Sequence, residues 1–271
     1  MTAPPALDGA MPHGAHGPVR LTVEGFVAEI ALANGSLNLV TKPLLRALHA
    51  ALVEVAANAG IRCLIVHGGE ARAFCAGSDM REFEHLGRDA SEEKILFEDM
   101  VLRMLSRVPM PTIAAIDGPA LGGGLEIALA CDLRVCRGGV ALGLTESRVG
   151  GLAGNGSVRL ARLIGPARAT DMLFTGETVS TDQALTWGLV NRVVEHSTAI
   201  EEARRMASTI AKRGPLSNRL AKRLVEAADD LPLDAALSMS TTAQQQIFDS
   251  RDLREGASAF FAKREPEFTG R

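Results

Sequence analysis

The sequence predicts an α/β core followed by a helical C-terminal region. Over the first two-thirds of the 271 residues, short apolar strands alternate with segments in which apolar residues recur at helical spacing. From Ser157 onward helical patterns dominate, and they are broken at glycine–proline pairs such as Gly165-Pro166 and Gly214-Pro215. Hydrophobic residues make up 46% of the chain, which is enough to fill a substantial core.

The first elements of the core have clear local signals. Val19–Val23 and Phe26–Leu32 alternate apolar and polar residues around a Glu-Gly turn, a pattern typical of a β-hairpin. Thr41 can cap a helix that ends at Gly60. Ile61–Val66 follows directly, and its continuous apolar run predicts a buried strand.

The middle of the chain continues the alternation. Ser91 is followed by two glutamates and begins the next helix, while Leu125–Ala130 is a short helix that three glycines precede as a loop. Strands are predicted at Thr112–Ile116, Leu133–Cys136 and Ala141–Leu144. A strand–strand–helix rhythm therefore recurs about every 40–50 residues, a period typical of repeat units.

Three segments are expected along the chain. Residues 1–18 are rich in Ala, Pro, Gly and His and have neither the apolar run of a secretory signal nor the arginines of a transit peptide, so they predict a flexible tail. Residues 19–200 form the core with the functional site, and residues 201–271 form the helical region. No apolar run is long enough to predict a membrane span.

The composition excludes several kinds of partner. The net charge is −3 and the pI about 6.1, with one Trp and no Tyr, so we expect no nucleic-acid or membrane partner. The four cysteines have no C-x-x-C spacing, which predicts buried thiols in a reduced, cytoplasmic protein. The histidines, including His49, His67 and His85, show no metal-ligand spacing, so we expect no metal.

Three loops are candidates for chemistry. In Arg72–Met80, small residues at 75–78 let a backbone N–H approach a ligand, although an ordinary turn fits equally well. In Asp117–Glu126, three glycines precede a helix and expose N–H groups at its positive end, where Glu126 could also serve only to stabilise the helix. Glu146 follows a short strand, a common place for catalytic groups, but could instead pair with a nearby arginine.

These segments together resemble those of the crotonase superfamily of enoyl-CoA hydratases and isomerases. The resemblance runs from about Val19 to the C-terminus and rests on the order of Arg-Ala-Phe-Cys-Ala-Gly-Ser-Asp, Ala-Leu-Gly-Gly-Gly-Leu-Glu and Ala-Cys-Asp-Leu-Arg-Val. A Thr-Gly-Glu…Ala…Trp-Gly-Leu-Val-Asn segment and a C-terminal Glu255…Phe260…Lys263 pattern complete it. The implied fold is a spiral of strand–strand–helix units with a C-terminal helical trimerisation region.

The resemblance implies enoyl-CoA hydratase activity, the reversible addition of water to an α,β-unsaturated acyl-CoA through an enolate. The backbone N–H groups of Ala76 and Gly123 would hold the thioester oxygen in an oxyanion hole. Glu126 would activate water and Glu146 would supply the proton to the α-carbon, with the roles exchanged in the reverse direction. A place in fatty acid metabolism would follow.

The resemblance also implies which residues bind coenzyme A and which oligomer the chain forms. The implied contacts to CoA and substrate come from Leu37, Arg72, Ala73, Ala76, Gly77, Ser78, Asp79, Met80, Gly122, Gly154, Phe260 and Lys263. CoA enters only as part of the substrate, and no tightly bound cofactor is expected. Relatives commonly form homotrimers or homohexamers, in which the C-terminal segment can reach a neighbour's nucleotide.

The chain departs from the family pattern after Glu146. Thr145 stands where the family often has proline, and Ala153–Ser157 replaces a Pro-Gly-x-Gly-Gly loop with a segment that is one residue shorter. Alternatives therefore stay open: a double-bond isomerase, decarboxylase, dehalogenase or thioester hydrolase of the same superfamily, or a catalytically idle CoA-binding scaffold.

Overall fold

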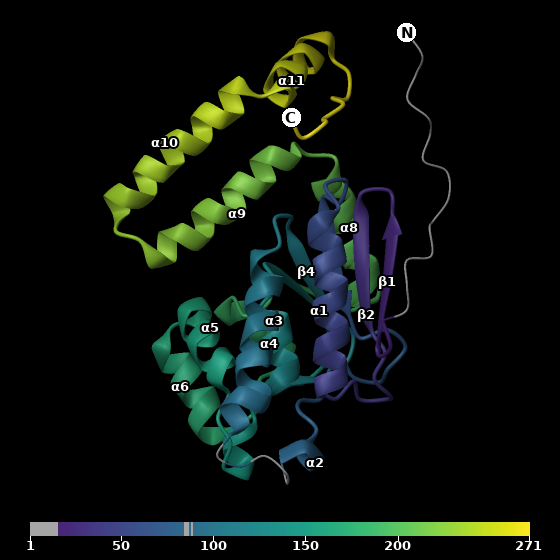
Figure 1. Ribbon diagram of the computed structural model, residues 1–271, viewed down its shortest axis with the longest axis vertical. Coiled ribbons are helices and arrows are strands. Elements are labelled where there is room, and N and C mark those ends of the chain that lie inside the picture. Colours follow the sequence, from purple (N-terminus) through teal and green to yellow (C-terminus); the bar gives the residue numbers. More distant parts are fainter. Residues whose placement is uncertain (1–15, 84–86, 88) are drawn as a thin grey trace.

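The protein is a mixed α/β fold with a helical C-terminal extension (Figure 1). The computed structural model describes residues 16–83, 87 and 89–271. Most of the predicted flexible tail, residues 1–15, and His85 lie outside the described residues.

The main sheet has six strands in the order β1-β2-β3-β4-β6-β8. β1 (Val19–Glu24) and β2 (Val27–Leu32) form the predicted antiparallel hairpin, and every later pairing in this sheet is parallel. The remaining strands are β3 (Cys63–His67), β4 (Thr112–Ile116), β6 (Leu133–Arg137) and β8 (Arg192–Val194). β8 lies where helices were predicted, because three residues are too few to show an alternating pattern.

A second row of short segments gives the fold its repeating unit. β5 (Ala120–Leu121) pairs in parallel with β7 (Leu142–Gly143), as expected for the second strand of each unit. Isolated bridges extend this row, since Val40 pairs with Ser78, Cys75 with Ala120, and Leu142 with Val179. Each of β2, β3, β4 and β6 is therefore followed by a short segment that pairs with that of a neighbouring unit, and all three candidate loops meet along this row.

The first helix begins at its predicted cap, whereas two later helices begin differently from the prediction. In α1 (Lys42–Ala57), Thr41 accepts a hydrogen bond from the Leu44 N–H, as predicted. The helix expected from Ser91 starts as a π-helical turn (Ser91–Ile95) before α3 (Leu96–Arg107). The glycines were predicted as a loop, but two of them form the first turn of α4 (Gly123–Leu129). The other helices of the core are α2 (Met80–Phe83), a 3-10 helix (Glu146–Val149), α5 (Gly154–Ile164), α6 (Pro166–Thr175) and α7 (Thr181–Trp187).

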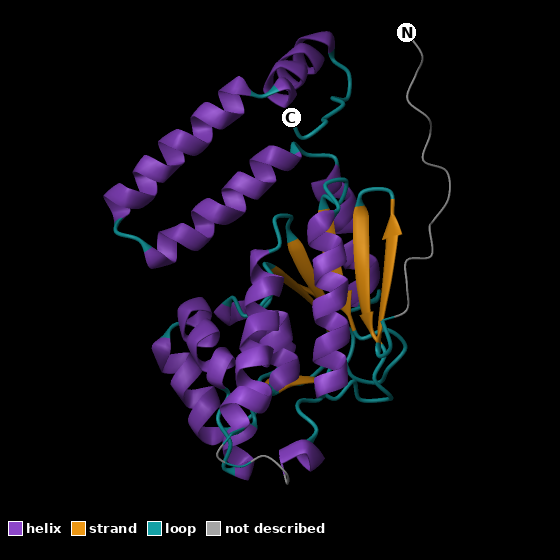
Figure 2. Ribbon diagram, viewed as in Figure 1, coloured by secondary structure: helices purple, strands orange, loops and turns teal. Residues whose placement is uncertain are grey.

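The main sheet is covered on both faces (Figure 2). One face packs against α1, α3 and α4 in the large hydrophobic core. The other face packs against α8 (Ala199–Ala211), whose small side chains at Ala199, Ala203 and Ala207 allow close approach to β3, β4 and β6. α8 thus packs against the sheet of the core, whereas the sequence analysis expected the core to span residues 19–200; that boundary stays a prediction.

The C-terminal helices extend away from the sheet (Figure 1). α9 (Pro215–Asp230) and α10 (Leu233–Asp249) pack side by side, and α11 (Arg251–Ala262) follows. Several large apolar side chains of α10 and α11 are exposed: Leu233, Leu237, Phe248, Phe260 and Phe261. Among the described residues, no helix combines the length and apolar character that crossing a bilayer requires.

One buried asparagine fixes the first candidate loop. Asn38 is fully buried with a positive φ of 49°, a conformation that asparagine tolerates better than most residues. Its side-chain amide donates to the carbonyl oxygens of Gly68, at 2.8 Å, and Phe74, at 3.1 Å. Its Oδ1 accepts from the Asn34 N–H at 2.8 Å. A single side chain therefore ties the β2–α1 connection to the segment after β3.

We predict that Asn38→Ala lowers the free energy of unfolding by about 3 kcal/mol, because buried carbonyl oxygens lose their donor. Asn38→Asp should be no better, since a carboxylate repels those oxygens. Urea denaturation followed by circular dichroism measures the change. Asn58→Ala, at an exposed residue that bonds only to the nearby Gly60 N–H, is the matched control. If Asn38→Ala lowers the free energy of unfolding no more than Asn58→Ala, the Asn38 side chain does not hold the two segments together.

Candidate active site

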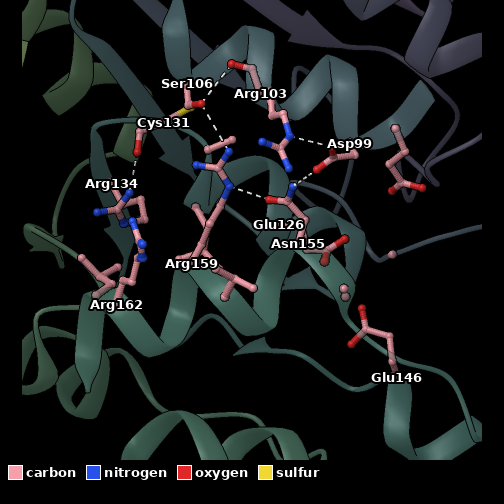
Figure 3. Close-up of a pocket in the computed structure, with 18 of the residues that line it drawn as sticks. Asp99, Arg103, Ser106, Glu126, Cys131, Arg134, Glu146, Asn155, Arg159 and Arg162 are labelled. Carbon is pink, nitrogen blue, oxygen red and sulfur yellow. Dashed lines mark hydrogen bonds and ion pairs between the residues drawn. The ribbon is translucent and has the colours of Figure 1, made fainter. Parts of the chain in front are cut away.

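The three candidate loops line one cavity of about 1750 Å³ (Figure 3). Its walls also include residues of α3, α5 and α9. Glu126 and Glu146 both face the cavity, together with the ends of the first loop and the glycine loop. The structure thus brings together the groups on which the sequence prediction depends.

The glycine loop (Asp117–Glu126) places the N-terminus of α4 in direct contact with the first loop (Arg72–Met80). A Cβ on Gly124 would lie 2.1 Å from the Cys75 carbonyl oxygen, so only glycine fits there. Gly122 caps the helix with φ of 52°, and the Glu126 N–H donates to its carbonyl oxygen. The N–H groups of the first helical residues, including Gly123, therefore have no partner within the helix and are free to bind an anion.

The first loop offers a different amide from the one predicted. The Ala76 N–H already donates to the Leu37 carbonyl oxygen at 3.0 Å, so Ala76 is not the free donor that we expected. Ser78 forms a parallel bridge with Val40 through the flanking Gly77 carbonyl and Asp79 N–H. In such a bridge the N–H of the central residue points away from its partner. Ser78 Oγ lies 3.4 Å from where a Cβ of Gly123 would be, so Ser78 and Gly123 are neighbours and their N–H groups are the candidate pair of donors.

Glu126 is a buried carboxyl group whose fixed contacts oppose the effect of burial on its pKa. Its Oε1 accepts from the Gly156 N–H at 2.6 Å, at the positive N-terminal end of α5. Burial raises the pKa of Glu126 above its ordinary value, while the Gly156 and Asn155 N–H groups and the charge of Arg159 oppose that rise. Glu126 is thus a buried carboxyl group with fixed contacts that stabilise its ionised form.

Glu146 has the opposite surroundings. It begins the 3-10 helix after β7, and its Oε1 lies 3.0 Å from where a Cβ of Gly122 would be. Its Oε2 is buried and accepts no hydrogen bond from the described residues. Burial, with a smaller contribution from the charge of Glu126, raises the pKa of Glu146 to about 7. Glu146 therefore holds a proton readily near neutral pH.

A polar network holds the shortened loop in place (Figure 3). Asn155 donates to Asp99 Oδ1 at 2.8 Å, and Arg159 donates to Asn155 Oδ1. Arg159 also reaches Ser106 Oγ at 3.2 Å, while Arg103 holds the other oxygen of Asp99 at 2.6 Å. Ala153–Ser157, expected as a loop that departs from the family pattern, instead forms the cap and first turn of α5. This turn is thus fastened to α3, and it carries the Gly156 N–H to Glu126. The sequence analysis missed these roles.

The remaining predicted contacts divide into two groups. Those that line the cavity are Ala76, Gly77, Ser78, Met80, Gly122 and Gly154. Those that do not line it are Leu37, Arg72, Ala73, Asp79, Phe260 and Lys263. Asp79 is buried and engages Arg81 through both carboxylate oxygens, at 2.9 and 2.6 Å. Phe260 lies in the last turn of α11 and Lys263 caps this helix, which stands away from the main sheet (Figure 1).

The cysteines are all free and buried, as predicted. Burial raises the pKa of each thiol, Cys63, Cys75, Cys131 and Cys136, to about 12. None is therefore a thiolate nucleophile at neutral pH. Within residues 16–83, 87 and 89–271, no group of three or more His, Cys, Asp or Glu side chains is placed to hold a metal ion. The expectation of no metal stays a prediction.

Comparison with known proteins identifies the family. The sequence profile of the enoyl-CoA hydratase/isomerase family matches residues 22–271, nearly the whole chain. The chain belongs to the crotonase superfamily. The (E)-benzylidenesuccinyl-CoA hydratase of Thauera aromatica is 36% identical over 93% of this chain and 99% of its own length. The human mitochondrial enoyl-CoA hydratase domain-containing protein 2 is 35% identical, over 81% of this chain and 77% of that protein.

Solved crotonase structures agree with the fold. The crystal structure of an enoyl-CoA hydratase from Bacillus anthracis superposes with a TM-score of 0.90 at 33% identity. The match covers 94% of this chain and all of that one. The predicted α/β fold of the crotonase type, with its helical C-terminal region, is therefore confirmed.

We predict that Glu146→Gln stabilises the protein at alkaline pH. A carboxyl group whose folded pKa is about 7 keeps its proton where the unfolded chain, near 4.5, has lost it. Wild-type stability therefore falls as pH rises from about 4.5 to about 7, and the neutral amide removes this loss. The variant's melting temperature should exceed that of wild type at pH 8 and converge with it at pH 4. The exposed Glu265→Gln is the control, and a Glu146→Gln protein less stable than wild type at pH 8 would contradict the prediction.

Proposed function

We propose that this protein is an enoyl-CoA hydratase, which adds water reversibly across the α,β double bond of an acyl-CoA thioester. The observation that carries the proposal is the pair of carboxyl groups in unlike surroundings at one cavity. Glu126 has contacts that stabilise its ionised form, and Glu146 has a pKa of about 7 and no hydrogen bond on Oε2. A carboxyl group with donors to its ionised form, beside one that holds a proton near neutral pH, is what an addition of water requires.

The two glutamates divide the reaction between them. Ionised Glu126 takes a proton from water as the water oxygen bonds to the β-carbon, and the electrons of the double bond move to the thioester oxygen. The N–H groups of Ser78 and Gly123 hold the resulting enolate oxygen, and loss of one such donor costs roughly 3–4 kcal/mol of the activation free energy. Protonated Glu146 then gives its proton to the α-carbon. Because the two groups titrate together, the roles belong to the pair, and they reverse in dehydration.

The second carboxyl group favours hydration over isomerisation. Moving a double bond requires one group to carry a proton between two carbons, whereas hydration requires a separate base for water. The Thauera aromatica relative is described as a hydratase, and it covers nearly the same length. Isomerase, decarboxylase, dehalogenase and thioester hydrolase reactions, or an idle CoA-binding scaffold, are the alternatives that the assay separates.

The test is the loss of ultraviolet absorbance of the enoyl thioester, with crotonyl-CoA and with longer and cyclic enoyl-CoAs. Glu126→Gln and Glu146→Gln should each reduce kcat by roughly 10³-fold, because each removes a proton-transfer group, while binding of the CoA ester persists. Glu177→Gln, at an exposed loop residue, should leave turnover unchanged. Normal hydration by both active-site variants would refute the mechanism. A rise in dienoyl absorbance or release of free CoA would favour another reaction of the superfamily.

We predict that Asn155→Ala reduces kcat roughly tenfold or more, because the loop that carries the Gly156 N–H is released from Asp99. The contacts that favour ionised Glu126 then weaken, so the acidic limb of the pH profile of kcat/KM should move to higher pH. Asn155→Asp places a carboxylate against Asp99 and should not restore the activity. Asn191→Ala, at an exposed residue whose side chain accepts from the Arg134 N–H, serves as a control. An unchanged pH profile would show that the network does not position Glu126.

We further propose that the helical extension mediates self-association, as a homotrimer or homohexamer. The exposed apolar side chains of α10 and α11 support this, because contiguous exposed apolar surface favours association. Phe260 is exposed and packs edge-to-face on Phe261, with ring centroids 5.7 Å apart. In such an assembly Phe260 and Lys263 would contact CoA bound to a neighbouring copy.

A further inference from the structure

A third carboxyl group stands beside the two amides of the oxyanion hole. Glu98 projects from α3 into the cavity. Its Oε1 lies 3.6 Å from where a Cβ of Gly123 would be, and Ser78 Oγ lies 3.4 Å from the same point. Gly123 and Ser78 are the residues whose N–H groups we assign to the thioester oxygen. Glu98 therefore forms part of the wall of the space in which negative charge would develop.

The carboxyl group of Glu98 has no ion pair or hydrogen bond with the described residues. The nearest cation on its own segment, Lys94, is buried and lies 3.3 Å from Glu82 Oε2, so it is already paired. The other charged groups that act on Glu98 are the carboxyl groups of Glu126 and Glu146. Negative charges on α2, α4 and the 3-10 helix thus act on Glu98, and the buried Lys94 is the cation that opposes them.

These surroundings favour the neutral form of Glu98. Burial and then the charge of Glu126 raise the pKa of Glu98 to about 7, Glu82 and Glu146 add to this, and Lys94 opposes it. Of Glu98, Glu126 and Glu146, Glu126 has the backbone N–H contact that stabilises a charge. Since neighbouring carboxylates repel one another, these surroundings favour a proton on Glu146 and on Glu98.

The charge state of Glu98 has direct consequences for an enolate. An ionised carboxylate next to the oxyanion hole would oppose the negative charge that grows on the thioester oxygen. A neutral carboxylic acid does the reverse, because its O–H can donate to that oxygen, and other active sites keep a carboxyl group protonated for this purpose. Glu98 therefore stabilises the enolate when it is protonated and destabilises the enolate when it is ionised.

We propose that Glu98 is a third catalytic group, which works in its protonated form as a hydrogen-bond donor beside Gly123 and Ser78. Its proton stays on Glu98 throughout, so the proton transfers of Glu126 and Glu146 are unaltered. The proposal rests on the proposed acyl-CoA chemistry, but it concerns stabilisation of the enolate and holds for any crotonase reaction that passes through one.

The first test measures enolate binding without turnover. Acetoacetyl-CoA is titrated into wild type and variants from pH 6 to pH 9, and the ultraviolet absorbance of its bound enolate is recorded. Glu98→Gln, which donates but cannot ionise, should match wild type at pH 6 and exceed it at least about tenfold in enolate affinity at pH 9. Glu98→Met, which cannot donate, should bind the enolate at least about tenfold more weakly than Glu98→Gln at every pH. Glu92→Gln, at an exposed residue preceding α3, should follow wild type.

Two outcomes would overturn the proposal. If wild type and Glu98→Gln share one pH dependence, Glu98 does not titrate beside the enolate. If Glu98→Met equals Glu98→Gln, its carboxyl group is not a donor. A protein that fails to hydrate enoyl-CoAs but stabilises the enolate as predicted would refute the hydratase assignment while supporting the role of Glu98.

A spectroscopic measurement on the free protein keeps the test independent of any ligand. The infrared carbonyl band of a protonated carboxyl group should be present in wild type at pH 6 and disappear as pH rises through about 7. The wild-type minus Glu98→Gln difference spectrum isolates the contribution of Glu98 from that of Glu146. Absence of this band from the difference spectrum at pH 6 would also overturn the proposal.

Discussion

The contact between the glycine loop and the segment after β3 is the constraint on which the site depends. The backbones of the two segments exchange hydrogen bonds, from the Cys75 N–H to the Pro119 oxygen and from the Leu121 N–H to the Cys75 oxygen. Gly124 lies so close to that same oxygen that no side chain fits between them. This contact fixes the distance between the first loop and α4, and with it the relative positions of Ser78, Gly123 and Glu126.

The electrostatic surroundings then differ among the glutamates of the cavity, and so do the protonation states that they favour. Glu98, Glu126 and Glu146 are among the acidic residues that line the cavity. Of these three, Glu126 accepts a hydrogen bond from the Gly156 N–H at the start of α5, and the Asp99–Asn155 hydrogen bond holds that turn in place. Glu146 and Glu98 lack such contacts, and burial favours their neutral forms. Ala153–Ser157, where this chain departs from the usual family pattern, is therefore an ordered part of the site, and the acid–base assignments depend on its contacts.

The sequence predicted what backbone patterns and glycines encode. Alternation revealed the strands of the core, and the three glycines before Glu126 marked a donor loop in the correct place. The sequence could not distinguish Ala76 from Ser78, because both are small and the difference lies in a hydrogen bond from the Ala76 N–H to the distant Leu37 carbonyl oxygen. Glu98 and Asp99 were missed for a related reason. On a helix, neighbouring acidic residues are usually a solvated face, and only the fold, in which α3 is linked to α5 through Asp99 and Asn155, places them at a cavity.

The row of short segments from Val40 through Ser78, Ala120 and Leu142 to Val179 has a consequence for divergence within the superfamily. Its pairings use backbone atoms, so the positions of Ser78 and Gly123, whose amides we propose for the thioester oxygen, depend little on the side chains around the row, apart from the close contact that requires Gly124. Other walls of the cavity come from α3, α5 and α9. Substitutions in those helices can therefore change the shape of the cavity while the backbone of the row stays in place.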